Sequence, residues 1–161
     1  MEPPPILGPF ALLSRVGEGA TSIVWSGVHQ VTATPAALKI LKAAPDARHR
    51  EALRHEVRAV ASLDHPGIVS VLDQGDAETP WVAMELVRGG TLGPLCGRLA
   101  WPAVRPILSA LLGALGHAHA RGVVHRDVKP SNVLLDEHGA PRLVDFGIAA
   151  VLHDRPVHGA M

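Results

Sequence analysis

The sequence predicts an α+β fold, with a β-rich first half that contains one helix and a mainly helical second half. Short apolar segments of β type are confined to about the first 86 residues, whereas a long apolar pattern of helical spacing begins at residue 101. A glycine-rich segment, RGGTLGPLCGR at 88–98, separates the two halves. With 47% hydrophobic and 19% charged residues among 161, the chain can bury a core.

The charge balance narrows the classes of partner. Fifteen basic and fifteen acidic residues cancel, so no overall field attracts nucleic acid or an anionic membrane. The single cysteine, Cys96, excludes an internal disulfide and fits a reducing compartment. The N-terminus lacks the features of a signal peptide, and no apolar run reaches the ~18 residues of a membrane helix. We therefore expect a cytoplasmic protein with no nucleic-acid partner and no membrane segment in this chain.

Five segments of the first half are predicted as strands because they are short, rich in apolar residues and bounded by turn residues. They are FALLSRVGEG at 10–19, SIVWSGVHQV at 22–31, AALKILK at 36–42, GIVSVLDQ at 67–74 and WVAMEL at 81–86.

Two segments are predicted as helices from their apolar spacing. In DARHREALRHEVRAVASLD, at 46–64, the apolar positions are Leu53, Val57, Val60 and Leu63. In WPAVRPILSALLGALGHAHARG, at 101–122, they are Val104, Leu108, Leu111 or Leu112, and Leu115. The second helix is expected to stop at Gly122, which can serve as a C-terminal cap.

Three features of the first half are candidates for phosphate binding. Gly17 and Gly19 lie at a turn between two predicted strands, where backbone N–H groups can approach a phosphate. A Gly-x-Gly hairpin is more often only a tight turn. Lys39 is flanked by apolar strand residues, and its alternative role is an edge lysine that points to water. Glu56 would fix Lys39 for a phosphate if the two met, and is otherwise a solvated helix residue.

The stretch VVHRDVKPSNVLLD, at 123–136, places charged residues between two apolar runs, which predicts a loop clamped between short strands. Asp127 is suited to accept a proton or orient a hydroxyl, Lys129 to stabilise a transferring phosphate, and Asn132 to offer an oxygen to a cation. Asp145, in LVDFGIA, supplies a second oxygen directly after an apolar strand. Asn132 and Asp145 suit Mg²⁺, although DFG alone also fits an ordinary turn.

Seven features occur in an order and spacing that resembles the eukaryotic-type (Hanks-type) protein kinase family, particularly its bacterial serine/threonine branch. They are GEGATSIV, AALK, the helix glutamate, LDHPGIV, MELVRGGTL, HRDVKPSN and DFG. The similarity runs from about residue 8 to about residue 152, and Lys129 matches the serine/threonine subclass. The resemblance implies a kinase-like fold, with a five-stranded antiparallel N-lobe sheet, one N-lobe helix and a mainly helical C-lobe.

The resemblance also implies roles for the candidate residues. Lys39 would contact the α and β phosphates of ATP and pair with Glu56. Asp127 would be the catalytic base, supported by Lys129 at the transferring phosphate. The metal ligands, for Mg²⁺ or Mn²⁺, would be Asn132 and Asp145.

The remaining family positions surround the nucleotide or join the lobes. The implied ATP-binding residues are Val16, Gly17, Gly19, Ser22, Val24, Ala37, Lys39, Met84 as gatekeeper, Glu85 to Val87 as hinge, and Leu134. The implied packed column between the lobes consists of Val60, Val71, His125 and Phe146. Arg126, before the catalytic aspartate, implies regulation by phosphorylation of an activation segment.

Two departures from the family pattern matter. Ser22 replaces the third glycine of the phosphate loop, which reduces backbone freedom there. No APE motif or later C-lobe helix follows DFG, so residues 1–161 are expected to be an incomplete kinase domain, with an N-lobe at 8–87 and a partial C-lobe at 88–161. We expect apolar C-lobe surface that a partner could cover, and little kinase activity from this chain alone.

The sequence thus favours an ATP-dependent protein serine/threonine kinase with a signalling role, whose substrates are proteins with serine or threonine acceptors. Two alternatives stay open at this point. One is a non-catalytic ATP-binding or partner-regulating module, and the other is an inactive gene fragment.

Overall fold

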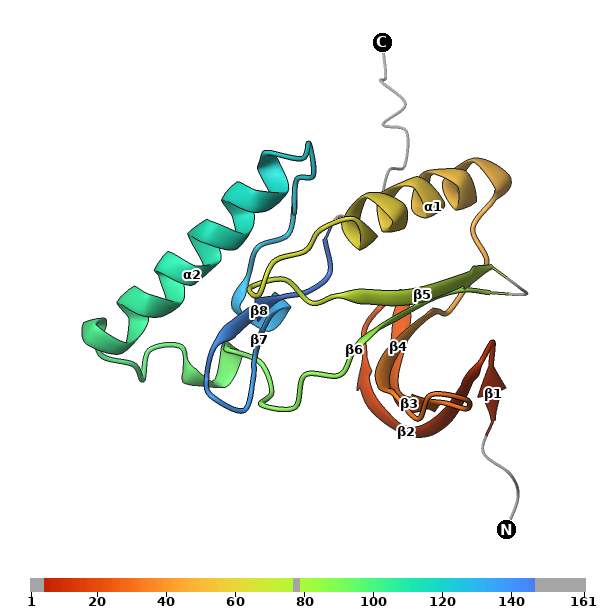
Figure 1. Cartoon of the computed structure of the whole chain (residues 1–161), viewed down its shortest axis with the longest axis horizontal. Coiled ribbons are helices and arrows are strands. Elements are labelled where there is room, and N and C mark those ends of the chain that lie inside the picture. Colours follow the sequence, from red (N-terminus) through yellow and green to blue (C-terminus); the bar gives the residue numbers. More distant parts are fainter. Residues whose placement is uncertain (1–4, 77–78, 147–161) are drawn as a thin grey trace.

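The computed structural model describes residues 5–76 and 79–146. Figure 1 shows a curled sheet with helix α1 beside β5, while helix α2 lies next to a small hairpin. The strands are β1 (Ile6–Leu7), β2 (Phe10–Glu18), β3 (Ser22–His29), β4 (Pro35–Leu41), β5 (Val71–Asp76), β6 (Pro80–Glu85), β7 (Val133–Leu135) and β8 (Pro141–Leu143). The helices are α1 (Ala47–Ala61) and α2 (Trp101–His119), with short 3₁₀ turns at Gly93–Leu95 and Pro130–Asn132.

Within the described residues, six strands form an antiparallel sheet in the order β1-β2-β3-β4-β6-β5, and β7 pairs with β8 in a separate hairpin. All five predicted strand segments contribute a strand to the large sheet, which confirms the predicted fold class. The sixth strand, β1, pairs Ile6 with Ala11 and Leu7 with Phe10. Two residues are too few to show a period of two, so this edge strand could not be predicted from the sequence.

Helix α1 starts and packs as its sequence predicts. The Asp46 side chain caps it by accepting a hydrogen bond from the His49 N–H at 2.9 Å. Leu53, Val57 and Val60 are buried against the sheet and the second half of the molecule. The helix ends at Ala61, three residues before the predicted end, and the following 62–70 segment crosses to β5.

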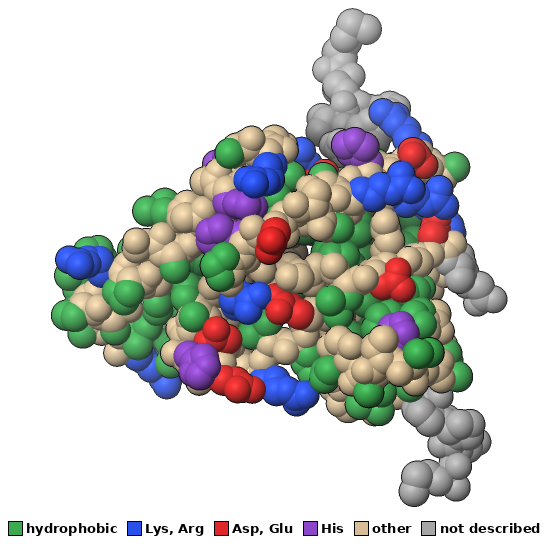
Figure 2. Space-filling view, viewed as in Figure 1, with side chains coloured by type: hydrophobic (Ala, Val, Ile, Leu, Met, Phe, Trp, Pro, Cys, Tyr) green, Lys and Arg blue, Asp and Glu red, His purple; other side chains and the backbone are tan. Residues whose placement is uncertain are grey.

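Helix α2 buries a narrower face than predicted. Leu111, Ala114 and Ala118 are buried, whereas Leu108 and Leu112 are 44% and 69% exposed. Of the two alternatives at the centre of the pattern, Leu111 is therefore the core position. Figure 2 shows hydrophobic side chains gathered over α2. No helix in the described part of the chain has the length and hydropathy that a bilayer span requires.

The end of α2 confirms the role expected of Gly122. This glycine has φ +74°, a left-handed conformation that residues with a Cβ rarely adopt. The reversal lets the N–H of Val123 donate to the carbonyl of Ala118 at 3.0 Å. The chain then enters the loop that carries Asp127.

Three clusters of buried residues hold these elements together. One consists of side chains from the strands of the large sheet, around Phe10, Leu38 and Trp81. A second joins α1 to the sheet. The third joins the end of α1 to α2 and the β7–β8 hairpin, around Leu143 and Phe146. This third cluster places the hairpin, and therefore the predicted loop and DFG residues, against the end of the sheet.

We expect Leu38→Ala to lower the free energy of unfolding by about 2–5 kcal/mol, because it removes a fully buried side chain and leaves a cavity. Leu38 lies directly over Gly27, where an added Cβ would sit 2.4 Å from the Leu38 Cδ1. Val31→Ala is the control, since Val31 is 87% exposed and its truncation should change stability by less than about 0.5 kcal/mol. Urea unfolding of both variants measures the difference, and equal losses would contradict this assignment of the core.

Candidate active site

A cavity of about 900 Å³ lies between the large sheet and the β7–β8 hairpin. Its size is within the range of sites for small molecules and cofactors. The predicted residues that line it are Val16, Gly17, Gly19, Ser22, Val24, Ala37, Lys39, Met84, Glu85, Val87, Lys129, Asn132, Leu134 and Asp145. These residues come from segments more than 100 positions apart in the sequence, so only the fold brings them to one place.

The strand register explains why Lys39 faces the cavity. Side chains alternate between the two faces of a sheet, so Ala37 and Lys39 share one face of β4, and Leu38 points to the other. Leu38 is in the core of the sheet, whereas Ala37 and Lys39 line the cavity. Val24, paired with Lys39 across the β3–β4 ladder, lines the cavity as well. The edge-lysine alternative is wrong, because β4 has a partner strand on each side and the Lys39 side chain is only 11% exposed.

The predicted glycine turn closes one end of the cavity. The N–H of Gly19 donates to the carbonyl of Ser22 at 2.8 Å, which forms the turn between β2 and β3. Ser22 itself is buried, so its hydroxyl takes space that a third glycine would leave open.

Asp127, Lys129 and Asn132 form one hydrogen-bonded unit. The Asn132 Nδ2 donates to the Asp127 carbonyl at 2.8 Å and to its Oδ2 at 2.9 Å. The Lys129 Nζ lies 2.8 Å from the same Oδ2. The hydrogen bond from Lys129, and secondarily that from Asn132, hold the pKa of Asp127 below its ordinary value. Asp127 is therefore an ionised acceptor at neutral pH, held in a fixed orientation.

The two acidic residues expected around Lys39 are arranged differently from the prediction. The Lys39 Nζ lies 2.6 Å from Asp145 Oδ1, whereas the Glu56 Oε1 lies 3.9 Å from Arg126 Nη1. No ion pair joins Lys39 to Glu56 in the described part of the chain. A part-buried ammonium is stable only when it is paired with a nearby carboxylate. Asp145 supplies that carboxylate, and its backbone has a positive φ of +64°.

The oxygen donors suit the predicted cation. Asn132 uses its Nδ2 for the contacts with Asp127, which leaves its amide oxygen available, and Asp145 supplies a carboxylate on the same cavity. Amide and carboxylate oxygens are the ligands that Mg²⁺ takes alongside phosphate and water. Among the described residues, no group of three or more His, Cys, Asp or Glu side chains could hold a metal alone. A cation here would take its remaining ligands from phosphate and water.

His125 connects the loop to the strand before Asp145. Its ring is buried, with Nε2 2.9 Å from the carbonyl oxygen of Val144 and Nδ1 accepting the N–H of Asp127 at 3.3 Å. This pattern fits the neutral Nε2–H tautomer. The His125 ring also packs on Phe146, with centroids 4.5 Å apart. Val60 and Phe146 share one buried cluster with Val71 packed beside it, so the four predicted column residues do lie together.

We expect stability to fall as the pH is lowered from about 7.5 to about 5.5. Burial holds the pKa of His125 below 6.5, so the unfolded chain binds the proton more readily, and acidification through the unfolded-state pKa favours unfolding. Burial lowers the pKa of His117 in the same direction. Urea unfolding at the two pH values should show a smaller pH effect in His125→Gln than in the parent. His117→Gln separates the second contribution, and stability that rises on acidification would contradict this assignment.

Sequence reasoning missed several residues that line the same cavity. They are Ser14, Glu18, Ser26, Val69, Arg88, Gly90, Thr91, Ser131 and Val144. In the sequence, Val69 and Val144 are apolar residues with no mark of a binding role. They line the cavity because the 62–70 segment lies beside β8, where the Val69 N–H donates to the Leu143 carbonyl. Conversely, Asp127 and Glu56 do not line it.

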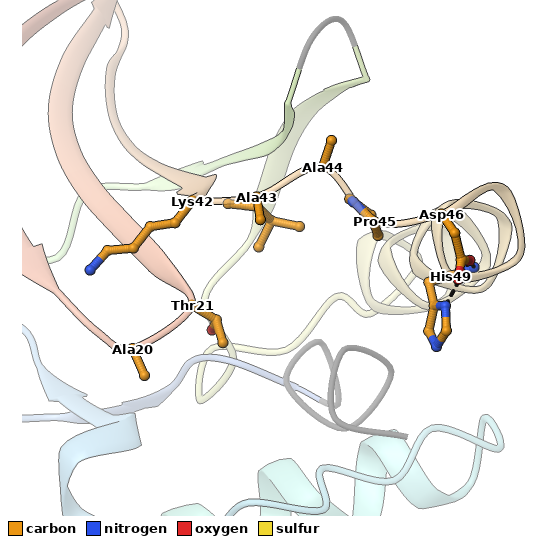
Figure 3. A pocket seen from close by; sticks show the side chains of 9 residues that line it. Ala20, Thr21, Lys42, Ala43, Ala44, Pro45, Asp46 and His49 are labelled. Atoms are coloured by element: carbon orange, nitrogen blue, oxygen red, sulfur yellow. Dashed lines mark hydrogen bonds and ion pairs between the residues drawn. The ribbon is translucent and has the colours of Figure 1, made fainter. Parts of the chain in front are cut away.

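A smaller cavity of about 380 Å³ lies beside the start of α1. Figure 3 shows Lys42 and His49 on opposite sides of this space, with His49 turned toward Asp46. The Lys42 Nζ is paired with Glu18 at 2.5 Å. This cavity contains none of the predicted residues, so the larger one is the candidate active site.

Comparison with known proteins gives consistent results. A family model described as the protein kinase domain matches residues 10–159. The chain is 40% identical over 145 residues to the serine/threonine-protein kinase PknL of Mycobacterium bovis, covering 86% of this chain and 36% of that protein. It is 38% identical over 154 residues to the DNA damage-responsive serine/threonine-protein kinase RqkA of Deinococcus radiodurans, covering 91% and 23%. The chain thus spans roughly a quarter to a third of the length of these relatives.

A solved structure supports the same assignment. The chain is similar to the crystal structure of the Mycobacterium tuberculosis PknI kinase domain, with a TM-score of 0.79 and 31% sequence identity. The match covers 92% of this chain and 63% of the PknI chain. The chain therefore belongs to the Hanks-type protein kinase family, among the bacterial serine/threonine kinases.

Proposed function

We propose that this chain carries the nucleotide site and the catalytic loop of an ATP-dependent protein serine/threonine kinase with a signalling role. The γ-phosphate of ATP would pass to serine or threonine hydroxyls of protein substrates. The observation that carries the proposal is the 900 Å³ cavity, whose lining combines Lys39, Lys129, Asn132 and Asp145 with apolar side chains from the sheet and the hairpin. This combination suits a ligand with a flat apolar part and a charged part bound to a cation.

The apolar part of the cavity supports adenine binding. Val24, Ala37 and Met84 line it from the sheet, and Leu134 lines it from the hairpin, so a flat ring could lie between them. Among the described residues, the backbone N–H of Val87 has no hydrogen-bond partner. It can therefore donate to a ring nitrogen of the base.

The charged end supports phosphate binding and transfer. Lys39 and the N–H groups of the Gly17–Gly19 turn would hold phosphate oxygens, with a Mg²⁺ or Mn²⁺ ion at Asn132 and Asp145. Such a cation would neutralise charge on the phosphates. Asp127 would orient the acceptor hydroxyl and take its proton, while Lys129 stabilises the charge on the transferring group.

One observation favours a second candidate, which is ATP binding without phosphate transfer. Lys39 is bound to Asp145, and Glu56 is near Arg126. Phosphate transfer by kinases needs the Lys–Glu pair and a metal-bound Asp at the same time. The observed pairs would have to rearrange on nucleotide binding, and a chain that cannot do so would bind ATP only.

Two further parts of the proposal concern the partners and the location of the protein. The exposed apolar side chains Leu108 and Leu112 on α2, together with Trp101, favour a partner or further chain that covers them. The cancelling charges give no reason to propose a nucleic-acid partner. A cytoplasmic location, expected from the single cysteine, stays a prediction.

A thermal-shift titration tests the proposed nucleotide site. ATP at about one hundred times its dissociation constant should add about 2.7 kcal/mol to the stability of the folded chain. The unfolding midpoint should then rise by roughly 5–10 °C with Mg²⁺ present, and by clearly less in EDTA. Phosphate transfer to a generic basic protein then separates the two candidates. A chain that shows no ATP-induced shift with either divalent cation would contradict both.

A further inference from the structure

Glu85 and Arg142 form an ion pair between the two halves of the molecule. Glu85 is the last residue of β6, and Arg142 lies in β8. The Arg142 Nη2 donates to the Glu85 Oε1, and the two side chains are only 18% and 31% exposed. Breaking a part-buried ion pair is costly, because the remaining charge is left without a partner.

The same two side chains also hold the segment that precedes β5. The Glu85 Oε1 accepts the N–H of Ser70 at 2.9 Å, and the N–H of Glu85 donates to the Ser70 carbonyl at 3.0 Å. The Arg142 Nη2 donates to the carbonyl of Ile68 at 3.3 Å. The pair therefore joins the end of β6, the 68–70 segment and β8 into one bonded unit.

This unit continues directly into the candidate active site. The N–H of Leu143 donates to the Gly67 carbonyl at 2.8 Å, and the N–H of Val144 donates to the Asn132 carbonyl at 3.1 Å. Asp145 follows, three residues after Arg142. The Arg142 Nε is buried without a hydrogen-bond partner in the described part of the chain. Among the described residues, the carboxylate paired with its guanidinium is that of Glu85.

We propose that Arg142, acting through Glu85, is a positioning residue for Asp145. The pair fixes the strand that presents Asp145 relative to the end of β6, and so sets how well Asp145 can hold a nucleotide-bound cation. The cation part of this inference rests on the proposed nucleotide-binding function. The strand-fixing part can be measured without any ligand.

The first measurement is amide hydrogen exchange of the whole 161-residue chain without ligand. In Arg142→Met, the Leu143 and Val144 amides should exchange about tenfold faster or more, because the strand loses its anchor to β6. Arg142→Lys should restore most of the protection, since it keeps a charge opposite Glu85. The matched control is Arg50→Met, which removes one of the two arginines paired with the comparably buried Asp76, far from β8. It should leave Leu143 and Val144 unchanged.

The second measurement is the ratio of ATP affinity with Mg²⁺ to ATP affinity in EDTA. We expect Arg142→Met to lower this ratio by about tenfold, a change of 1.4 kcal/mol, and Arg50→Met to leave it unchanged. A purely structural role would lower both affinities together and keep the ratio. If Arg142→Met does not fold, Glu85→Gln serves instead, because it removes the charge and keeps an acceptor for the Ser70 N–H.

The outcomes separate the positioning role from the proposed function. Unchanged exchange at Leu143 and Val144, or an equal rise throughout the chain, would overturn the positioning role whatever the nucleotide does. If the parent binds ATP and the ratio is unaffected by Arg142→Met, the effect on Asp145 is also overturned. If exchange responds locally but the parent binds no ATP, the proposed function fails, and the anchoring of β8 by Arg142 stands.

Discussion

Asp127→Asn should lower the rate of phosphate transfer by about 100- to 10,000-fold, the range expected when a general base is removed. The amide keeps the shape of the side chain and can still contact Lys129 and Asn132, so the loop should stay in place. It can no longer accept the proton of the acceptor hydroxyl. ATP affinity should change little, because Asp127 does not line the nucleotide cavity.

The assay compares this chain with a form that carries more of a kinase domain. The match to the PknI kinase domain covers 63% of that structure, so the remainder of PknI can be joined to this chain to supply the other part of the domain. Transfer from labelled ATP to a generic basic protein is measured for this chimera and for the 161-residue chain alone. We expect the chain alone to be at least about 100-fold slower, since small displacements of reacting groups cost rate of that order.

Two results would contradict the assignment of Asp127. Equal transfer by the chimera and its Asp127→Asn variant would show that another group accepts the proton. Loss of ATP binding along with transfer would show that the variant had disturbed the cavity instead. Asp136→Asn is the control, since Asp136 is a half-buried residue whose carboxylate accepts two backbone N–H groups outside the cavity.

Lys39→Met and Asp145→Asn should each weaken binding of ATP with Mg²⁺ by about 10- to 100-fold, the value of one or two charge-assisted hydrogen bonds. Lys39→Met removes the ammonium that would hold phosphate oxygens. Asp145→Asn removes the carboxylate proposed to bind the cation, so its effect should appear with Mg²⁺ and be small in EDTA. Titration with a fluorescent ATP analogue measures both, with and without Mg²⁺.

Both variants also change the stability of the unliganded protein, so stability is measured together with binding. Lys39 and Asp145 are paired with each other at 2.6 Å, so either substitution leaves one part-buried charge unpaired. The double variant Lys39→Met/Asp145→Asn removes both charges and should recover part of the stability. Arg50→Met is the control, because Arg50 pairs with Asp76 and neither residue lines the nucleotide cavity. An ATP-induced shift that survives in both single variants would place the nucleotide elsewhere.

Much of the site could be predicted from the sequence because its parts are short and local. The loop from His125 to Asn132 contains an acid, a lysine and an amide within eight positions, and the structure joins the Asp127, Lys129 and Asn132 side chains by contacts of 2.8–2.9 Å. Five strand segments could be predicted as well, since each is a short apolar run bounded by turn residues. The family resemblance then assigned roles that spacing alone left open.

The ion-pair partners could not be predicted, because each joins residues remote in the chain. The family resemblance implied Glu56 as the partner of Lys39, but the folded chain pairs Lys39 with Asp145 and brings Glu56 near Arg126. The Glu85–Arg142 pair joins positions 57 apart in the sequence, and neither residue carries a local signal of it. A part-buried charge needs an opposite charge beside it. Which opposite charge lies beside it depends on how the sheet and the hairpin pack.

By itself, the sequence determined the five longer strands of the large sheet, the two helices and the residue types that could do phosphate chemistry, since propensity, periodicity and motif spacing are local properties. Only the tertiary structure decided which face of α2 is buried, because the apolar pattern fitted both Leu111 and Leu112 and packing against β8 selected Leu111. It also decided that β4, through Lys39, faces the β7–β8 hairpin across one cavity. Those outcomes depend on contacts between segments far apart in the sequence, and the pattern of one segment does not show which other segment it will contact.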